Sequence, residues 1–210
     1  MNTLAKLTWA IAFGLTGSSW GTCDADATPD IARSAERLAT TTCASCHGVG
    51  GRSTAPTFPK LAAQTAPYLS LQLHAFRDQT RGDPDAQAYM WGMASQLSDE
   101  MIEAISTYYA AQTPSPAKPG DPKLLAPGKA IFEKGISAQG TLACVTCHGA
   151  GAGGNATFPR LAGQHAPYLV KQMLVIQSAL RSAPVMHGVI KDLTPDQMRA
   201  VALYLESVGP

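Results

Sequence analysis

The chain has 210 residues, a length that suits one or two domains. Its 16 Lys and Arg residues nearly balance its 15 Asp and Glu residues, and no basic stripe of the kind that binds nucleic acid is visible. A hydrophobic fraction of 45% excludes wholesale disorder.

Residues 1–27 are predicted to be a secretory signal peptide. Lys6 is followed by an apolar run of roughly ten residues, which is too short to span a bilayer because a spanning helix needs about 20. An A-x-A cleavage site ends at Ala27, so the mature chain is expected to begin near Thr28. The short run disfavours the alternative of a retained membrane anchor, and the residues before Cys23 disfavour cleavage as a lipoprotein.

The mature chain is a tandem repeat with an offset near 100 residues. The matching segments are residues 43–48 with 144–149, 57–62 with 157–162, and 66–69 with 166–169. Met90 and Met186 also match, at an offset of 96, so the two copies keep the same order of elements with small loop insertions.

A proline-rich segment joins the two copies. Its prolines are Pro114, Pro116, Pro119, Pro122 and Pro127. This composition favours extended, semi-rigid backbone over a helix, so residues 113–126 are predicted to link two domains, 28–112 and 127–210. Each domain has about 85 residues, a size at which a cofactor, metal or covalent staple usually completes the core.

Helical periodicity runs through both copies, and no segment shows the sustained alternation of a strand, so we predict an all-α fold. In the first copy, helices are expected over residues 30–40 with Asp30 as cap, from Pro67 onward, and after Ser98 as cap. Their inward positions are Ile31, Ala35, Leu38, Leu69, Leu73, Phe76, Ile102 and Ile105.

The second copy repeats the last two of these helices. One begins near Pro167, and the other combines Pro195 at its first position with a capping box of Thr194 and Gln197. Their inward positions are Leu169, Met173, Ile176, Met198, Val201 and Leu205. The mature chain is therefore expected to form two small all-α units.

Each copy contains one C-x-x-C-H motif. The two motifs consist of Cys43, Cys46 and His47, and of Cys144, Cys147 and His148. A C-x-x-C pair alone fits a redox dithiol, half of a zinc site or a disulfide, but the adjacent histidine makes it the attachment signature of c-type haem. On one helical turn, both thiols reach the vinyl groups of one porphyrin edge and the histidine is held under the iron. Two covalently bound haem c groups are therefore predicted.

The alternatives to haem meet specific difficulties. A zinc site would have to combine both cysteine pairs across the 98 residues from Cys46 to Cys144. A thioredoxin-like dithiol would need a βαβ pattern nearby, and none is visible. Haem attachment takes place outside the cytoplasm, which agrees with the signal peptide.

Met90 and Met186 are predicted to be the sixth iron ligands. A Met and His pair suits an electron carrier, because the soft thioether favours ferrous iron and raises the reduction potential. Each methionine stands eight residues before a predicted cap, which places it in the loop before the last helix. Met93 competes in the first domain and His187 in the second. The methionines predicted to lie in the core are Met101, Met173 and Met198.

Other groups are expected to hold the haems. The Phe-Pro segments ending at Pro59 and Pro159 are close enough to offer a backbone carbonyl to the Nδ1–H of each motif histidine, although a plain loop anchor is the alternative. The candidates for bonding the haem propionates are Tyr68, Tyr168, Gln64, Gln164, Arg52 and Arg160. His74 and His165 are predicted to be surface residues or satisfied polar contacts.

In the first copy, the motif series reads C-x-x-C-H at 43–47, F-P-x-L-A-x-Q at 58–64, A-x-Y-L-x-x-Q-L at 66–73 and M-x-x-x-A-x-x-L-S-D at 90–99. With its repeat in the second copy, this series resembles the dihaem cytochrome c4 family over essentially the whole mature chain. The resemblance implies two cytochrome c domains related by a pseudo-twofold axis, with the haem propionate edges facing each other. The departures are Ala63 for Gly, Ile190 for Ala, and Thr194-Pro195 for Ser-Asp.

The resemblance implies an electron carrier rather than an enzyme, secreted to the periplasm. Family members pass electrons from a quinol-oxidising complex towards a terminal oxidase, so redox proteins are the expected partners and nucleic acid is not. Peripheral membrane association stays open. One alternative is a dihaem enzyme, such as a peroxidase or a thiosulfate-oxidising cytochrome, which would need an open iron or a ligand other than Met. Another is the haem subunit of a dehydrogenase complex.

Overall fold

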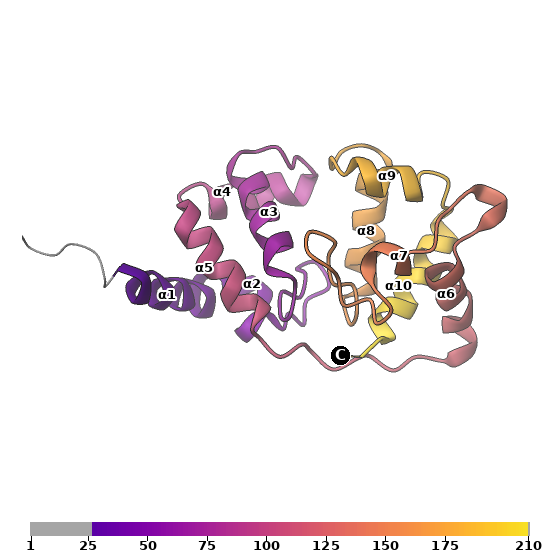
Figure 1. Ribbon diagram of the computed structural model, residues 1–210, viewed down its shortest axis with the longest axis horizontal. Coiled ribbons are helices and arrows are strands. Elements are labelled where there is room, and N and C mark those ends of the chain that lie inside the picture. The colour runs from indigo at the N-terminus through magenta and orange to yellow at the C-terminus, as the bar shows by residue number, and fades with distance from the viewer. Residues whose placement is uncertain (1–26, 210) are drawn as a thin grey trace, which may run out of the picture.

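The structure is a computed structural model that describes residues 27–209, in which two helical domains lie side by side (Figure 1). Helices α1–α5 form the first domain and α6–α10 the second. The described residues contain no strand and only two isolated bridges, so the predicted all-α fold class is confirmed. Among these residues, no helix is long and apolar enough to cross a membrane. The predicted signal peptide lies, except for Ala27, outside the described residues.

The first domain is organised around α5. The longer helices are α1 (Ala27–Leu38), α3 (Ala66–Arg77) and α5 (Asp99–Ala110). Shorter pieces are a π-helical turn at Ala39–Cys43, α2 (Ala44–His47), a 3-10 turn at Val49–Gly51, a second π-helical turn at Ala86–Met90, and α4 (Trp91–Ala94). Both α1 and α3 pack against α5.

The second domain repeats this arrangement around α10. The longer helices are α6 (Pro122–Lys134), α8 (Ala166–Gln177) and α10 (Pro195–Ser207). Shorter pieces are a 3-10 turn at Ser137–Gln139, α7 (Val145–His148) and α9 (Pro184–Ile190). Both α6 and α8 pack against α10, as their counterparts pack against α5.

The link between the domains is shorter than predicted. Residues 113–121 are not helical, but α6 begins at Pro122, so the extended backbone expected over 113–126 is wrong for its last part. The Asp121 side chain caps α6 by accepting a hydrogen bond from the backbone N–H of Lys123 at 2.9 Å, and a proline is tolerated in a first turn. We therefore place the start of the second domain at Pro122.

Most predicted caps and inward faces are confirmed. The Ser98 hydroxyl accepts a hydrogen bond from the first turn of α5, and Thr194 forms the predicted capping box with Gln197. Asp30 is the exception, because α1 already begins at Ala27 and Asp30 lies inside its first turn. The inward residues that are buried are Ala35, Leu69, Phe76, Ile102, Ile105, Leu169, Met173, Ile176, Met198, Val201 and Leu205.

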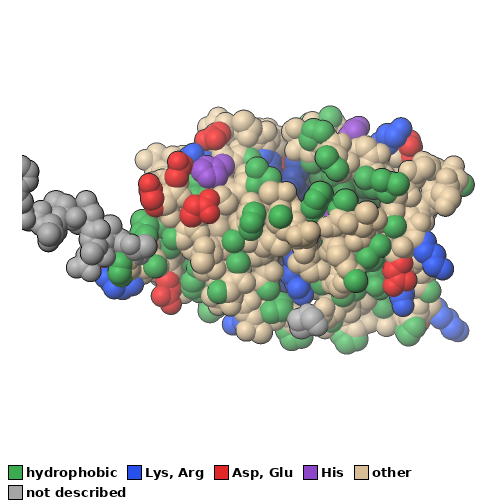
Figure 2. Space-filling model, viewed as in Figure 1, with side chains coloured by type: hydrophobic (Ala, Val, Ile, Leu, Met, Phe, Trp, Pro, Cys, Tyr) green, Lys and Arg blue, Asp and Glu red, His purple; other side chains and the backbone are tan. Residues whose placement is uncertain are grey.

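Charge is unevenly distributed over the face of the molecule in Figure 2. Acidic side chains gather on the outer part of the first domain, and Lys or Arg side chains, with fewer acidic ones between them, mark the far end of the second. A charged partner approaching this face therefore meets a different surface on each domain.

Candidate haem sites

Each C-x-x-C-H motif lies on a single short helical turn. α2 carries Cys46 and His47 directly after the π-helical turn that ends at Cys43, whereas α7 carries Cys147 and His148 directly after its N-cap, Cys144. Gly48 follows the first motif with a φ of 74°, and a Cβ there would lie 2.8 Å from the carbonyl oxygen of Arg52. This glycine lets the chain turn sharply after the histidine.

Neither C-x-x-C pair forms a disulfide, so all four motif cysteines can form thioether bonds to haem. Burial raises the pKa of the Cys43 thiol, although a hydrogen bond with Tyr109 opposes this, and burial raises the pKa of Cys144 to about 11. Within residues 27–209, no three His, Cys, Asp or Glu side chains gather as a metal site.

Each motif histidine donates to the backbone carbonyl that the sequence predicts. The Nδ1–H of His47 bonds the carbonyl oxygen of Pro59 at 2.9 Å, and that of His148 bonds Pro159 at 2.9 Å. Burial lowers the pKa of both imidazoles, against the opposing effect of these bonds, and this favours the neutral ring that ligates metals. The Nε2 atom of each ring is left to bind a metal.

A cavity with about 1370 Å³ of free space, part of it open to solvent, lies beside the first motif. Cys43, Cys46 and His47 line it together with Met90 and Met93. The rest of the lining is largely apolar and includes members of both hydrophobic clusters of the first domain: Leu69, Ile105, Tyr109, Phe76 and Ala86. Two thiols, an imidazole and a thioether around an apolar cavity are the donor set of a covalently attached haem, so these residues fit the predicted cofactor.

Met90 and Met186 lie in helical segments, not in the loops that we predicted. Met90 ends the π-helical turn at Ala86–Met90, and Met186 lies in α9, which begins at Pro184. The first domain has four more residues than the second between the matched proline (Pro84 or Pro184) and the methionine, and most of the π-helical turn lies within this longer segment.

The surroundings of Met90 favour it over its competitor Met93, and Met186 packs against the core of its domain. Met93 is 58% exposed, whereas Met90 is half-buried and packs against a hydrophobic cluster of the first domain. Met186 is half-buried and packs against the core cluster of the second domain, as Cys144 does. His187 follows Met186 directly, and its Nδ1–H donates to the carbonyl oxygen of Ile176 in α8 at 2.9 Å.

The two domains are joined by hydrogen bonds that repeat across a pseudo-twofold axis. The Gln64 side chain donates to the carbonyl oxygen of Arg160 at 3.0 Å and accepts from its backbone N–H at 2.6 Å. Gln164 makes the same pair of bonds with Lys60, both at 2.9 Å. Both glutamines line the first-domain cavity, but their side chains bridge the domains in this structure.

A buried cluster at the same interface was missed by our sequence interpretation. Arg81 donates to the side-chain oxygens of Gln72 and Gln172 at 2.8 and 2.9 Å. Arg181 donates to the same two oxygens at 2.9 and 2.6 Å, and to the hydroxyl of Tyr68 at 2.9 Å. The two arginines match at the offset of 100 residues, a signal that could have singled them out.

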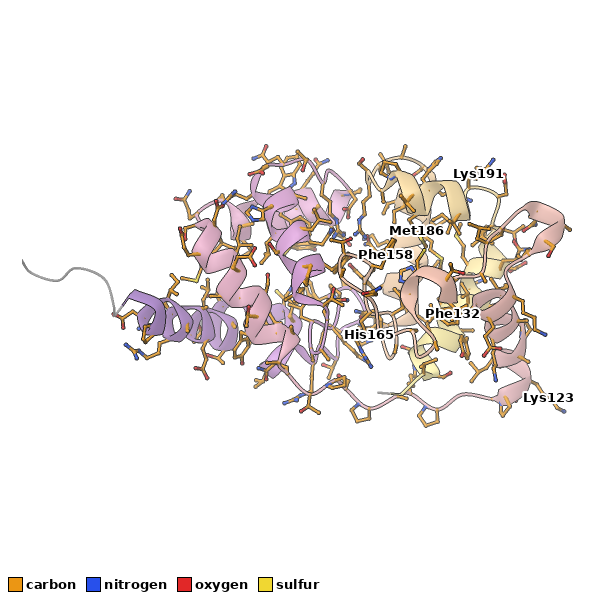
Figure 3. The ribbon with its side chains drawn as sticks, in the orientation of Figure 1. Lys123, Phe132, Phe158, His165, Met186 and Lys191 are labelled. Carbon is orange, nitrogen blue, oxygen red and sulfur yellow. The ribbon has the colours of Figure 1, made fainter. Side chains whose placement is uncertain are left out.

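The remaining polar candidates lie in different places. Tyr68 and Tyr168 line the first-domain cavity, whereas Arg52 is exposed and donates to the backbone carbonyl of Thr113 at 3.2 Å. His165, as predicted, is a satisfied polar contact, since its Nε2 lies 3.0 Å from the carbonyl oxygen of Ser53. Figure 3 shows His165 and Phe158 on the side of the second domain that faces the first, and Met186 farther from that boundary.

Comparison with known proteins places the chain in a family. The Cytochrome c family model matches residues 32–112 and 125–209. Cytochrome c4 of Pseudomonas aeruginosa is 34% identical over 204 residues, which cover 94% of this chain and 95% of that protein. The thiosulfate dehydrogenase electron acceptor of Thiomonas intermedia is 35% identical over 210 residues, covering 97% of this chain and 87% of the relative.

A solved structure supports the same conclusion at the level of the fold. The crystal structure of cytochrome c4 from Pseudomonas stutzeri is similar with a TM-score of 0.75 and 34% identity, over 84% of this chain and 98% of that one. The similarity extends over both domains, and each domain matches the Cytochrome c model separately. The chain therefore belongs to the dihaem cytochrome c4 family, whose members carry electrons on two covalently bound haem c groups and are not enzymes.

Proposed function

We propose that the chain relays single electrons between redox proteins in the periplasm, with one haem c attached in each domain. The proposed attachment and axial residues are Cys43, Cys46, His47 and Met90 in the first domain, and Cys144, Cys147, His148 and Met186 in the second. The observation that carries this proposal is the bond from each motif imidazole to a proline carbonyl, which leaves Nε2 to bind iron.

When bound, the haem supplies an iron that gains and loses one electron. The carbonyl oxygens of Pro59 and Pro159 fix the tautomer and orientation of the two imidazoles and make Nε2 a better donor. The soft thioether of Met90 or Met186 would favour the ferrous state of a haem bound in its domain. In the first domain, buried apolar side chains such as Leu69 and Phe76 line the cavity with His47 and Met90 and would keep water away from a haem held there.

We place the electron donor in the quinol-oxidising part of a respiratory chain and the acceptor at a terminal oxidase. Similarity to cytochrome c4 over nearly the whole chain supports this position, and the predicted removal of residues 1–27 supports the periplasm. Encounters between redox proteins bury small areas and are weak. We expect the acidic end of the first domain to change association rates more than affinity.

A thiosulfate dehydrogenase is a second candidate for the donor. The relative from Thiomonas intermedia is named as the electron acceptor of such an enzyme and covers 97% of this chain. In that role the same residues would hold the same two haems, and only the donor would differ. Rapid mixing of the ferric protein with each purified reduced donor distinguishes the two, since the physiological donor should reduce it much faster.

The axial ligands are tested by the optical spectrum of the ferric protein, in which each Fe–S(Met) bond contributes to a weak far-red band. Met90→Ala and Met186→Ala should each remove half of this band, because each leaves one iron without a thioether. Met93→Ala and His187→Ala are matched controls that should leave it intact. The reduced wild-type protein should not bind carbon monoxide. A high-spin haem or ready carbon monoxide binding would replace the carrier proposal with an enzyme that has an open iron.

A further inference from the structure

The two interface arginines, Arg81 and Arg181, occupy equivalent positions in the two domains. In the described structure, only Arg81 has a carboxylate partner. Asp83 is completely buried, and its Oδ2 accepts a hydrogen bond from Nε of Arg81 at 2.8 Å. Its Oδ1 has no hydrogen-bond partner among residues 27–209. Burying a carboxylate oxygen without a hydrogen-bond partner costs free energy, so the burial of Asp83 needs a physical explanation.

The repeat shows that this carboxylate belongs to the first domain alone. Arg81 and Pro84 align with Arg181 and Pro184 at an offset of 100, so residue 183 is the counterpart of Asp83, and it is an alanine. Arg181 bonds the same two glutamine oxygens as Arg81 does. The described structure gives it no ion pair with a carboxylate, whereas Arg81 has one.

Asp83 lies next to the segment that forms the first-domain cavity. Its backbone carbonyl accepts a hydrogen bond from Gln87 at 3.1 Å in the π-helical turn that ends at Met90. The cavity is lined by Asp85, Ala86 and Met90, and also by Arg81. The buried charge therefore lies beside the site of the first haem and next to the helical turn that carries its proposed sixth ligand.

The sign of the effect follows from the charge of the iron. Ferric iron carries one more positive charge than ferrous iron, so a nearby carboxylate stabilises the oxidised state and an arginine destabilises it. In the first domain the carboxylate offsets the arginine, whereas in the second no such offset exists. Because these groups are buried, solvent screens them weakly.

We propose that Asp83 lowers the reduction potential of the first-domain haem relative to the second, and so makes the two otherwise similar sites energetically unequal. The proposal rests on the proposed function, since it requires one haem in each domain. It assigns Asp83 a positioning and tuning role through Arg81, without direct contact between Asp83 and the iron.

The test is a spectroelectrochemical titration of the holoprotein. Asp83→Asn keeps an oxygen that can accept from Arg81 but removes the charge, so one of the two potentials should rise. We expect at least a tenfold change in the one-electron equilibrium constant, about 59 mV. The reciprocal variant, Ala183→Asp, should lower the other potential. Asp78→Asn is the matched control, because Asp78 is exposed and should leave both potentials unchanged.

Met90→Ala and Met186→Ala assign the potentials, since the far-red band left in each variant reports one domain. In the Met186→Ala background, Asp83→Asn should shift the remaining titration upward. An unchanged titration with the band halved would overturn the proposal for Asp83 and leave the proposed function intact. If Asp83→Asn does not fold, Ala183→Asp decides in the same way. If either methionine variant fails to halve the band, the ligand assignment is contradicted instead. The Asp83→Asn variant with both methionines intact would still test Asp83, because one of its two potentials should shift.

Discussion

In the first domain, Ala35 of α1 and Ala39 of the π-helical turn that follows it pack in one hydrophobic cluster with residues of α5, and the Tyr109 hydroxyl donates to the carbonyl of Ala39 at 3.2 Å. In the second domain, Gly128 and Phe132 have the same four-residue spacing on α6, which packs against α10. The α1–α5 pair and the α6–α10 pair occupy equivalent positions in the two domains. They differ in how small and large side chains are divided between the two helices.

The difference lies in how closely the backbones approach. The first domain pairs two alanines with one buried tyrosine on α5. The second domain places an aromatic residue on each helix, with the rings of Phe132 and Tyr204 5.7 Å apart. Gly128 then lets α6 approach α10 directly, because a Cβ at this position would lie 2.6 Å from the carbonyl carbon of Ala200. Only the second domain therefore depends on a glycine for this contact.

The largest effect is expected from Gly128→Ala. The added methyl group overlaps the backbone of α10, which cannot move away as a flexible side chain would. We expect the second domain to lose about 3 kcal/mol of stability, at the upper end of the usual cost of overpacking. Denaturant unfolding followed through the absorbance of both haems should show one transition shifted and the other nearly unchanged.

Gly188→Ala is the matched control for this variant. Gly188 lies in α9, and a Cβ there meets no atom within 4 Å. Alanine is the better helix former, so this change should be neutral or stabilising by up to about 1 kcal/mol. Equal destabilisation by both variants would contradict the close-approach explanation.

How far the sequence could predict the structure depends on whether a feature is local. The capping residues Ser98 and Thr194 and the histidine acceptors Pro59 and Pro159 were predicted because each acts within a short stretch of its own domain. The cluster around Arg81 could not be predicted in the same way, because it forms only when both domains meet. The helical placement of Met90 and Met186 was missed because a π-helical turn and the short helix α9 are too brief to show a helical period in the sequence.

The domain interface offers a second comparison, at Thr65 and His165. Both bridge the domains through a backbone carbonyl, that of Ala156 for the threonine hydroxyl and that of Ser53 for the imidazole. Only the histidine can titrate. Burial lowers the pKa of His165 from the ordinary value of 6.5, and the positive charges of Lys60 and Lys118 lower it further. The Ser53 carbonyl and the Glu206 carboxylate raise this pKa and so oppose the shift.

His165→Thr should therefore make stability less dependent on pH. In the wild type, the unfolded chain takes up a proton near pH 6.5 while the folded chain resists it, so this contribution is complete above 6.5 and is lost as the pH falls towards the lower folded pKa. Unfolding measured between about pH 7.5 and pH 5 should show a smaller loss of stability in the variant. An unchanged slope would contradict the role assigned to His165.

The smallest effect concerns Ala63 and Gly163, which have positive φ angles of 55° and 71° in equivalent turns. The backbone N–H of each donates to the last long helix of its domain, at 3.0 Å to Tyr109 and 2.8 Å to Leu205. Ala63→Gly should relieve the strain of a left-handed alanine and gain up to about 1 kcal/mol, and Gly163→Ala should lose about as much. A Cβ at residue 163 meets only ordinary contacts, the nearest at 3.6 Å, so the loss would come from φ alone. Opposite shifts of the two domain transitions would establish that the two turns differ in strain and not in packing, whereas destabilisation by both variants would mean that the greater freedom of glycine in the unfolded chain outweighs the relief at Ala63.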